Sequence, residues 1–106
     1  MGDTTVIKMS AAFAITGPLG QRQLVSGAHV ALRMWENEQP GEVKQATASP
    51  YETVGYVLAG EAELHIEGQM VRLEPGDAWV VPQGALHRYQ ILEPFTAIEA
   101  TSPPAI

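Results

Sequence analysis

The chain has no cysteine among its 106 residues. This absence excludes disulfide bonds, thiolate metal sites, cysteine nucleophiles and cysteine redox chemistry together. Charged residues are scarce, at 17 % of the chain, whereas 45 % of the residues are hydrophobic. This composition indicates a folded domain rather than a disordered segment. A chain of this length forms one domain, over residues 1–106, and is too short for a large catalytic fold. We expect its core at 13–103 and mobile ends at 1–12 and 104–106.

Basic residues are few, because 6 Lys and Arg stand against 12 Asp and Glu and leave a net charge of −6. They are scattered singly, so no basic stripe is present and we expect no nucleic-acid partner. Long hydrophobic runs are missing as well. The apolar stretch Met9–Ile15 is too short for a signal peptide, and nothing reaches the length of a membrane span. We therefore expect a cytoplasmic protein with no membrane partner.

Glycine and proline, by contrast, are frequent, with 10 and 8 copies. They form turn signals roughly every 8–10 residues, a spacing that leaves room for short strands but not for a helix of ordinary length. The pattern predicts an all-β sandwich or barrel. The turn signals in the second half of the chain are Gly60, Glu67-Gly68, Pro75-Gly76, Gln83-Gly84, Glu93-Pro94 and Ser102-Pro103.

Two kinds of strand are predicted. Around Glu67-Gly68 the segments 62–67 and 70–74 alternate apolar with polar residues, which is typical of a half-solvated hairpin. Val54–Ala59 and Ala78–Val81 are apolar on both faces and are expected to be covered on both sides. Because no helix is available as a second cover, we expect a second copy of the chain to supply it, in a homodimer.

The stretch from Gly76 to His87 has the pattern G-x5-P-x-G-x2-H. Its glycines stand where tight turns often need positive φ. Pro82 ends the apolar strand before it, because proline cannot donate to a ladder. His87 then opens the next strand.

This pattern resembles the second conserved motif of the cupin family. Residues 56–64 resemble the end of the first cupin motif, and the 15 residues between Gly60 and Gly76 match the spacing of small single-domain bacterial cupins. The resemblance covers about Pro40 to Pro103. It implies a small antiparallel jelly-roll barrel of the RmlC-like type and places His87 in the barrel mouth, where cupins hold a metal.

The first motif is degenerate. In metal-binding cupins it supplies two histidines and a Glu or Gln, and the spacing from Gly60 assigns these positions to Thr47, Ser49 and Thr53. Further on, the asparagine expected four residues after His87 is replaced by isoleucine.

Too few metal ligands remain. Glu52 is one residue away from the acidic position, and strand alternation turns it to the other face unless the bend at Pro50 intervenes. Catalytic metal sites usually take about three protein ligands, whereas within the two motifs only His87 and Glu52 are candidates. We expect no cofactor, and a divalent metal (Zn, Fe, Mn or Ni) is the alternative.

The same positions suggest a hydrogen-bonding pocket. Period-2 alternation turns Thr53, Gly55, Val57 and Ala59 to one face of their strand, and His87 and Tyr89 share a face on theirs. If both faces point inward, the mouth is lined by polar side chains suited to a small polar ligand. These predicted ligand-binding residues are Thr47, Ser49, Thr53 and Tyr89, beside His87 as the predicted catalytic residue.

Other residues have structural and functional interpretations. Arg33 interrupts an apolar run and either binds a substrate carboxylate or lies on a solvated face. Trp35 and Trp79 are predicted to pack in the core or in an interface rather than to stack on a ligand.

Three functions fit these residues. The first is metal-free binding of a small polar organic ligand, with acid/base isomerase or lyase chemistry at His87. The second is a metal-dependent dioxygenase, isomerase or sugar-acid-processing enzyme that uses His87 with Glu52 or His29. The third is a non-catalytic sensor or scaffold. The fold alone does not choose among them.

Overall fold

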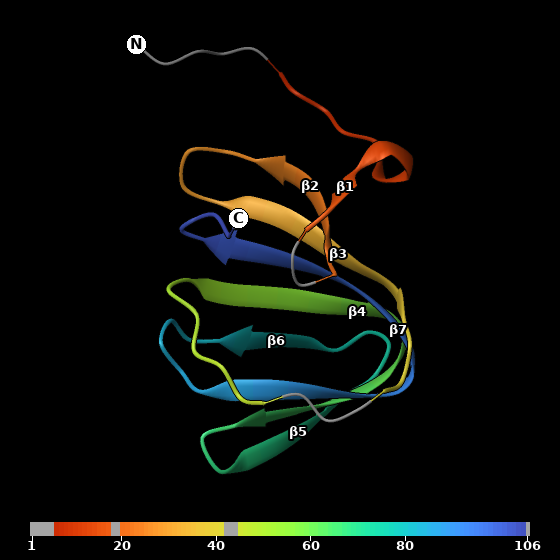
Figure 1. The fold of residues 1–106 in the computed structure, drawn as a ribbon, viewed down its shortest axis with the longest axis vertical. Coiled ribbons are helices and arrows are strands. Elements are labelled where there is room, and N and C mark those ends of the chain that lie inside the picture. The colour runs from red at the N-terminus through yellow and green to blue at the C-terminus, as the bar shows by residue number, and fades with distance from the viewer. Residues whose placement is uncertain (1–5, 18–19, 42–44, 106) are drawn as a thin grey trace.

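The computed structural model describes residues 6–17, 20–41 and 45–105. They form an almost entirely β fold (Figure 1), which confirms the fold class expected from the sequence. The elements are the 3-10 turn η1 (Ala11–Phe13) and the strands β1 (Ile15–Thr16), β2 (Arg22–Ser26), β3 (Ala31–Glu38), β4 (Glu52–Ile66), β5 (Gln69–Leu73), β6 (Ala78–Val81) and β7 (His87–Ser102).

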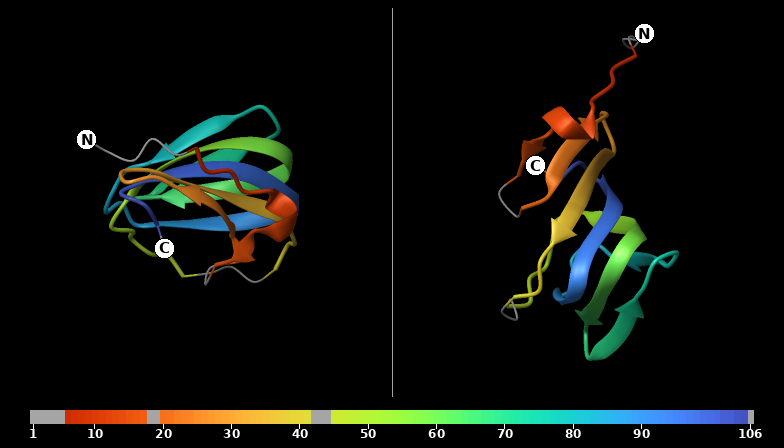
Figure 2. Two further views of the ribbon diagram at one scale, coloured as in Figure 1. Left: turned by 90° about the horizontal axis from the view of Figure 1, so that it is seen from above. Right: turned by 90° about the vertical axis from the view of Figure 1, so that its right-hand side faces the viewer.

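The strands pair in the order β1-β2-β3-β7-β4-β5, and β6 pairs with the other edge of the first half of β4. Every pairing is antiparallel. The long strands β4 and β7 pair along almost their whole length, from Glu52 opposite Ser102 to Ile66 opposite His87. Both strands bend halfway and close the sheet into a jelly-roll barrel (Figure 2).

Two predicted turns prove to be bends inside these long strands. Gly60 and Pro94 stop neither strand; instead, the register shifts three times between Val57 and Ala62. Gly60 has φ +84°, and a Cβ there would overlap the carbonyl oxygen of Pro94, so only glycine allows this close approach of the two backbones. The first register shift also turns Ala59 to the exposed side. The prediction that Ala59 shares the inner face is therefore wrong.

The barrel is filled by one apolar core. Trp35 and Trp79 belong to it, as predicted, and both are 8 % exposed. The hairpin predicted around Glu67-Gly68 is present as the β4–β5 pair, Pro82 follows the last residue of β6, and His87 opens β7. The buried residues of this core cluster are Trp35, Val57, Ala62, Leu64, Leu73, Trp79, Val81, Ala85, Phe95 and Ala97.

The outer face of the first half of β4 and of β6 is apolar and uncovered within the single chain. Val54, Tyr56, Leu58 and Val80 are each about half exposed, between 47 % and 51 %. These two strands, which the sequence makes apolar on both faces, are thus buried on one face only, and none of the described residues covers the other face. In the described residues no helix is long and apolar enough to cross a membrane.

The two ends of the described chain differ. Residues 6–10 run away from the barrel (Figure 1), and Val6 and Ile7 are 92 % and 71 % exposed. Ala105 is buried, and its N–H donates to the hydroxyl oxygen of Thr101 at 2.9 Å. Residues 1–5 and 106, part of the ends expected to be mobile, lie outside the described residues.

Candidate functional site

Polar residues are placed in the barrel by the register of β3, β7 and β4. Across β3 and β7, Arg33 lies opposite Glu99. Across β7 and β4, Gly55 lies opposite Glu99 and Thr53 lies opposite Thr101. Because side chains alternate along a strand, every second residue of these strands points inward. Arg33 and Glu99 therefore form one layer of the interior, next to a Thr53–Thr101 layer at the barrel end.

The Arg33–Glu99 layer is a buried ion pair. Arg33 Nε donates to Glu99 Oε1 at 2.8 Å, and Trp35 Nε1 donates to the same oxygen at 2.7 Å. The two charged residues are 7 % and 0 % exposed. Arg33 also donates from Nη1 to the Tyr51 hydroxyl oxygen at 3.2 Å and lies over the Tyr51 ring, 5.3 Å from its centroid. Half-buried Tyr51 thus covers the guanidinium.

The charge of Arg33 is maintained by its partners. Burial alone would lower the pKa of Arg33, but the Glu99 carboxylate and the Tyr51 hydroxyl together raise the pKa above its ordinary value. Removing either charge of the pair would leave the other without compensation inside the barrel.

Three aromatic side chains, those of Trp35, Trp79 and Tyr89, lie near this pair. The Trp79 indole fills the space beside Gly55, where a Cβ would overlap the indole ring. Its Nε1 donates to the Tyr89 hydroxyl oxygen at 3.1 Å, and the Trp35 and Tyr89 ring centroids are 5.9 Å apart. Burial, and next the nearby Glu99 charge, raise the pKa of Tyr89, so that its phenol stays protonated at neutral pH.

His87 has a defined proton arrangement. Its Nδ1 lies 2.9 Å from the carbonyl oxygen of Ala85, which can only accept, so Nδ1 carries the hydrogen. In the neutral ring Nε2 is then left as a proton acceptor. The His87 ring meets the Tyr89 ring edge-on, with centroids 5.7 Å apart at 84°.

The segment before β4 is tied to the same end of the barrel. Thr47 and His87 form an isolated antiparallel bridge, with N–H to carbonyl distances of 2.8 and 2.9 Å. The Gly84 N–H donates to the Ser49 carbonyl oxygen at 2.9 Å. The motif at 76–87 therefore holds the Thr47–Ser49 segment in place. Thr47 is exposed and Ser49 half-buried.

The comparisons with known proteins agree with this fold. A sequence model of the Cupin domain matches residues 34–99, more than half of the chain. The chain belongs to the cupin family. A search of curated proteins found no match.

Solved structures similar to this cupin include three bacterial proteins. The structure of KdgF from Halomonas sp. has a TM-score of 0.73 at 24 % identity and covers 93 % of this chain and 94 % of its own. An RmlC-like cupin from Shewanella frigidimarina has a TM-score of 0.78 at 18 % identity, with coverage of 93 % and 92 %. A cupin superfamily protein from Desulfitobacterium hafniense has a TM-score of 0.68 at 22 % identity, with coverage of 77 % and 74 %. At these identities the likeness shows the fold alone.

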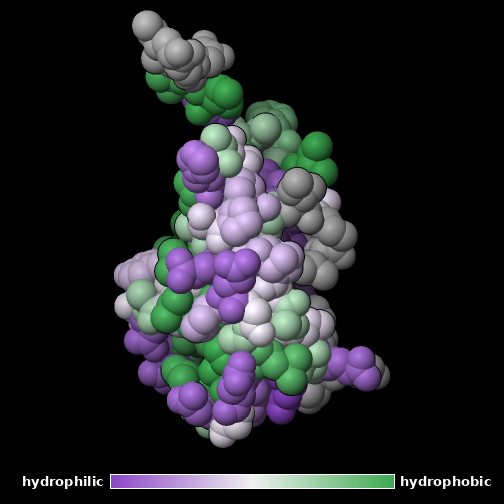
Figure 3. Space-filling view, turned by 90° about the vertical axis from the view of Figure 1, so that its left-hand side faces the viewer, coloured by the Kyte–Doolittle hydropathy of each residue, from purple (hydrophilic) through white to green (hydrophobic). Residues whose placement is uncertain are grey.

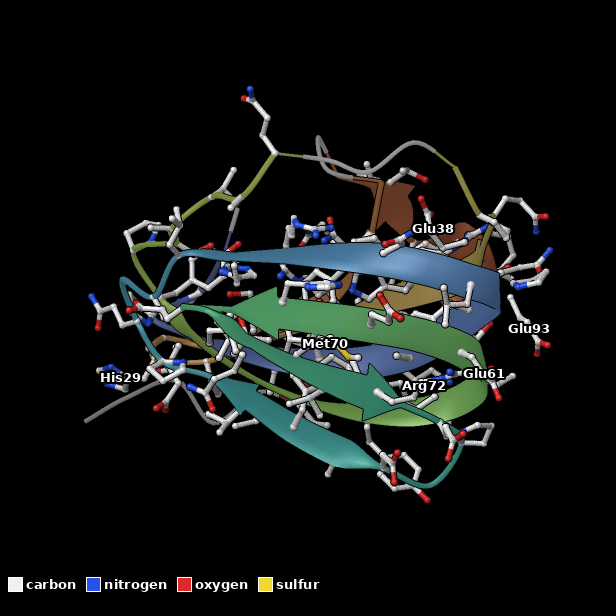
Figure 4. The ribbon with its side chains drawn as sticks, turned by 90° about the horizontal axis from the view of Figure 1, so that it is seen from below. His29, Glu38, Glu61, Met70, Arg72 and Glu93 are labelled. Atoms are coloured by element: carbon white, nitrogen blue, oxygen red, sulfur yellow. The ribbon has the colours of Figure 1, made fainter. Side chains whose placement is uncertain are left out.

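The donor set of this cupin does not fit a divalent metal site. The three positions that the first motif assigns to metal ligands carry hydroxyl groups, and hydroxyls are not the usual ligands of catalytic zinc or iron. Glu52, the candidate acidic ligand, is exposed, and its inward neighbour is Thr53. His29 is exposed beyond the end of the barrel (Figure 4). Among the described residues, no three His, Cys, Asp or Glu side chains are grouped so that they could hold a metal ion.

The structure therefore brings together only part of the predicted site. Arg33, Thr53, and the neighbouring His87 and Tyr89 come from three strands, β3, β4 and β7, and lie on inward faces of the barrel. Of the two readings of Arg33, the buried position excludes the solvated face. The third histidine, His65, lies on the outer face, where its Nε2 is 3.0 Å from Glu63 Oε1.

Sequence reasoning missed Glu99 and Tyr51. Glu99 is the only charged residue of the segment 95–101, where buried residues alternate as Phe95, Ala97, Glu99 and Thr101. That alternation was a signal for an inward carboxylate. Arg33 is 66 residues away in the chain, and its pairing with Glu99 depends on how β3 and β7 align, which the sequence does not display.

The surface at this end of the barrel is mixed. Figure 3 views the side on which β4 and β7 begin and shows an apolar area on the lower half, bordered by hydrophilic side chains. Leu86, which precedes His87, is 52 % exposed. A mostly apolar lining with a few converging polar side chains is the ordinary composition of a small-molecule site.

Proposed function

We propose that this cupin binds a small polar organic ligand at the end of the barrel that holds Thr53 and His87, through hydrogen bonds and without a divalent metal. The observation that carries the proposal is the buried Arg33–Glu99 pair inside an otherwise apolar core. A buried ion pair is often no more stabilising than apolar residues of the same volume. Its retention in such a core supports a role for the pair in recognising a polar ligand.

We further propose that His87 is a proton-transfer group for isomerase or lyase chemistry. The hydrogen bond from Nδ1 to Ala85 leaves Nε2 to accept a proton from the ligand and to return it. The protonated phenol of Tyr89 lies beside the imidazole and is suited to orient an oxygen of the ligand. A non-catalytic sensor would use the same side chains for binding only.

A thermal-shift screen against sugars, sugar acids, keto acids and small phenolics tests ligand binding. We expect at least one compound to stabilise the wild type more than the His87→Ala/Thr47→Val double variant. His65→Ala, a histidine change on the outer face, is the matched control and should behave as the wild type. If no compound distinguishes the wild type from the double variant, the scaffold interpretation replaces this one.

Metal analysis of tag-free protein tests the other half of the proposal. We expect no stoichiometric Zn, Fe, Mn or Ni. Stoichiometric metal that is lost on His87→Ala would overturn the metal-free interpretation and favour the metal-dependent one.

We also propose that the apolar outer face of β4 and β6 packs against a second copy of the chain. An exposed apolar face of this kind is unusual for a monomer. Because Val54, Tyr56, Leu58 and Val80 carry no charge, the face can meet its own copy about a two-fold axis despite the net charge of −6.

Light scattering at micromolar concentration tests this interface. We expect a mass of about 22.8 kDa, twice the 11.4 kDa of the chain. Leu58→Lys and Val80→Lys should give the monomer mass. Met70→Lys, at a 54 % exposed apolar residue of β5, is the control and should leave the dimer intact. A monomeric wild type would refute the proposal.

A further inference from the structure

One oxygen of the buried Glu99 carboxylate is unused. Oε1 accepts two hydrogen bonds, from Arg33 and Trp35, whereas the equally buried Oε2 has no hydrogen-bond partner among the described residues. A carboxylate oxygen can only accept, so Oε2 requires a donor. A buried charged acceptor without a donor is costly. A bound molecule that brings a donor would remove this cost.

The charges around this oxygen already cancel. Among the buried residues that the structure describes, only Arg33 and Glu99 are charged, with opposite signs. The Tyr89 phenol is neutral, because burial raises its pKa. An anionic ligand would therefore meet an arginine already neutralised by Glu99, and it would lie near the carboxylate. A neutral ligand pays no such electrostatic penalty.

The surrounding hydroxyls offer donors. The Tyr89 oxygen accepts from Trp79, and the Tyr51 oxygen accepts from Arg33, so each phenol keeps its own hydrogen to donate. A ligand hydroxyl can donate to Glu99 and accept from a phenol at the same time. The aromatic rings of Trp35 and Trp79 add apolar surface.

From these contacts we infer that the barrel of this cupin selects an uncharged polyhydroxy ligand, a sugar or a polyol, over the corresponding sugar acid. One ligand hydroxyl donates to Glu99 Oε2. This inference rests on the proposed function, because it names the class of ligand for the same site.

Calorimetric titration with two matched pairs tests the selectivity. The pairs are D-glucose with D-glucuronate and D-glucitol with D-gluconate. We expect the wild type to bind the neutral member of at least one pair about tenfold more tightly than the acid, a difference of about 1.4 kcal/mol.

Glu99→Gln removes the negative charge with little change of shape, so Arg33 is then the only buried charge among the described residues. We expect the preference to shift by about tenfold or more toward the acid. Glu61→Gln is the matched control, because Glu61 pairs with Arg72 on the outside at the far end of the barrel from His29 (Figure 4). It should leave the ratio unchanged. Circular dichroism checks that both variants fold.

The possible outcomes separate the ligand preference, the role of Glu99 and the proposed function. A wild type that binds the acids more tightly than the neutral members overturns the inference and leaves the proposal of ligand binding in place; this comparison needs no variant. A neutral preference that Glu99→Gln, shown to be folded, does not change overturns the role of Glu99. If the wild type binds neither member of either pair, the inference is wrong, and the proposed function is decided separately by the wider thermal-shift screen.

Discussion

Replacing Arg33 by methionine would leave the Glu99 carboxylate buried without its counter-charge. Removing one partner of a buried pair typically costs about 3–5 kcal/mol. The whole domain is expected to be stable by only about 5–15 kcal/mol. At about 4–5 °C per kcal/mol for a domain of this size, the melting temperature of Arg33→Met should fall by roughly 12–25 °C.

The double variant Arg33→Met/Glu99→Met distinguishes a coupled pair from two separate contacts. With both charges gone, the main remaining defect is the Trp35 N–H without its acceptor, a cost of about 1–3 kcal/mol. The double variant should therefore be more stable than Arg33→Met alone.

Urea unfolding followed by tryptophan fluorescence measures these differences. Arg72→Met is the control, because Arg72 pairs with Glu61 on the surface and its loss should leave the urea midpoint unchanged. An Arg33→Met cost below about 1 kcal/mol would refute the reasoning, since the pair would then behave like an exposed one. A double variant less stable than Arg33→Met would refute it as well.

Two further changes test other parts of the barrel. Burial raises the pKa of Tyr89 in the folded state, so above about pH 10 the unfolded chain loses this proton first. The stabilisation is therefore complete below that pH and falls as the pH rises. In urea melts between pH 8 and 11, Tyr89→Phe should make this fall in stability shallower, whereas Tyr56→Phe on the exposed face should not; equal slopes in the wild type and Tyr89→Phe would contradict the assignment. Gly60→Ala combines positive φ with an overlap on the Pro94 carbonyl and should cost about 2–5 kcal/mol. Gly41→Ala, where a Cβ meets nothing, should be nearly neutral in the same denaturation assay; equal costs for the two glycines would contradict the proposed close approach.

The motif at 76–87 could be predicted from the sequence because its information is local. Glycine turns, the strand-ending Pro82 and the start of β7 at His87 depend on neighbouring residues, and the structure confirms each. The inward faces of Thr53 and His87 follow from alternation over a few residues and are found as expected.

The bends at Gly60 and Pro94 could not be predicted in the same way. The local sequence looks the same whether a glycine ends a strand or lets two strands approach closely. Which of the two occurs depends on the partner strand. Burial of Arg33 has the same cause. Alternation permits either face, and the choice depends on Glu99 at the opposite position of β7.

The Arg33–Glu99 pair also bears on how accurately the chain folds. A slip of β3 against β7 by one residue would turn Arg33 out to water and leave Glu99 alone in the barrel. A slip by two residues would keep Arg33 inside but place it opposite Ala97 or Thr101. Either misalignment leaves an unpaired charge in an apolar interior, at a cost of several kcal/mol. The pair thus favours the native alignment of β3 and β7 over both misaligned registers.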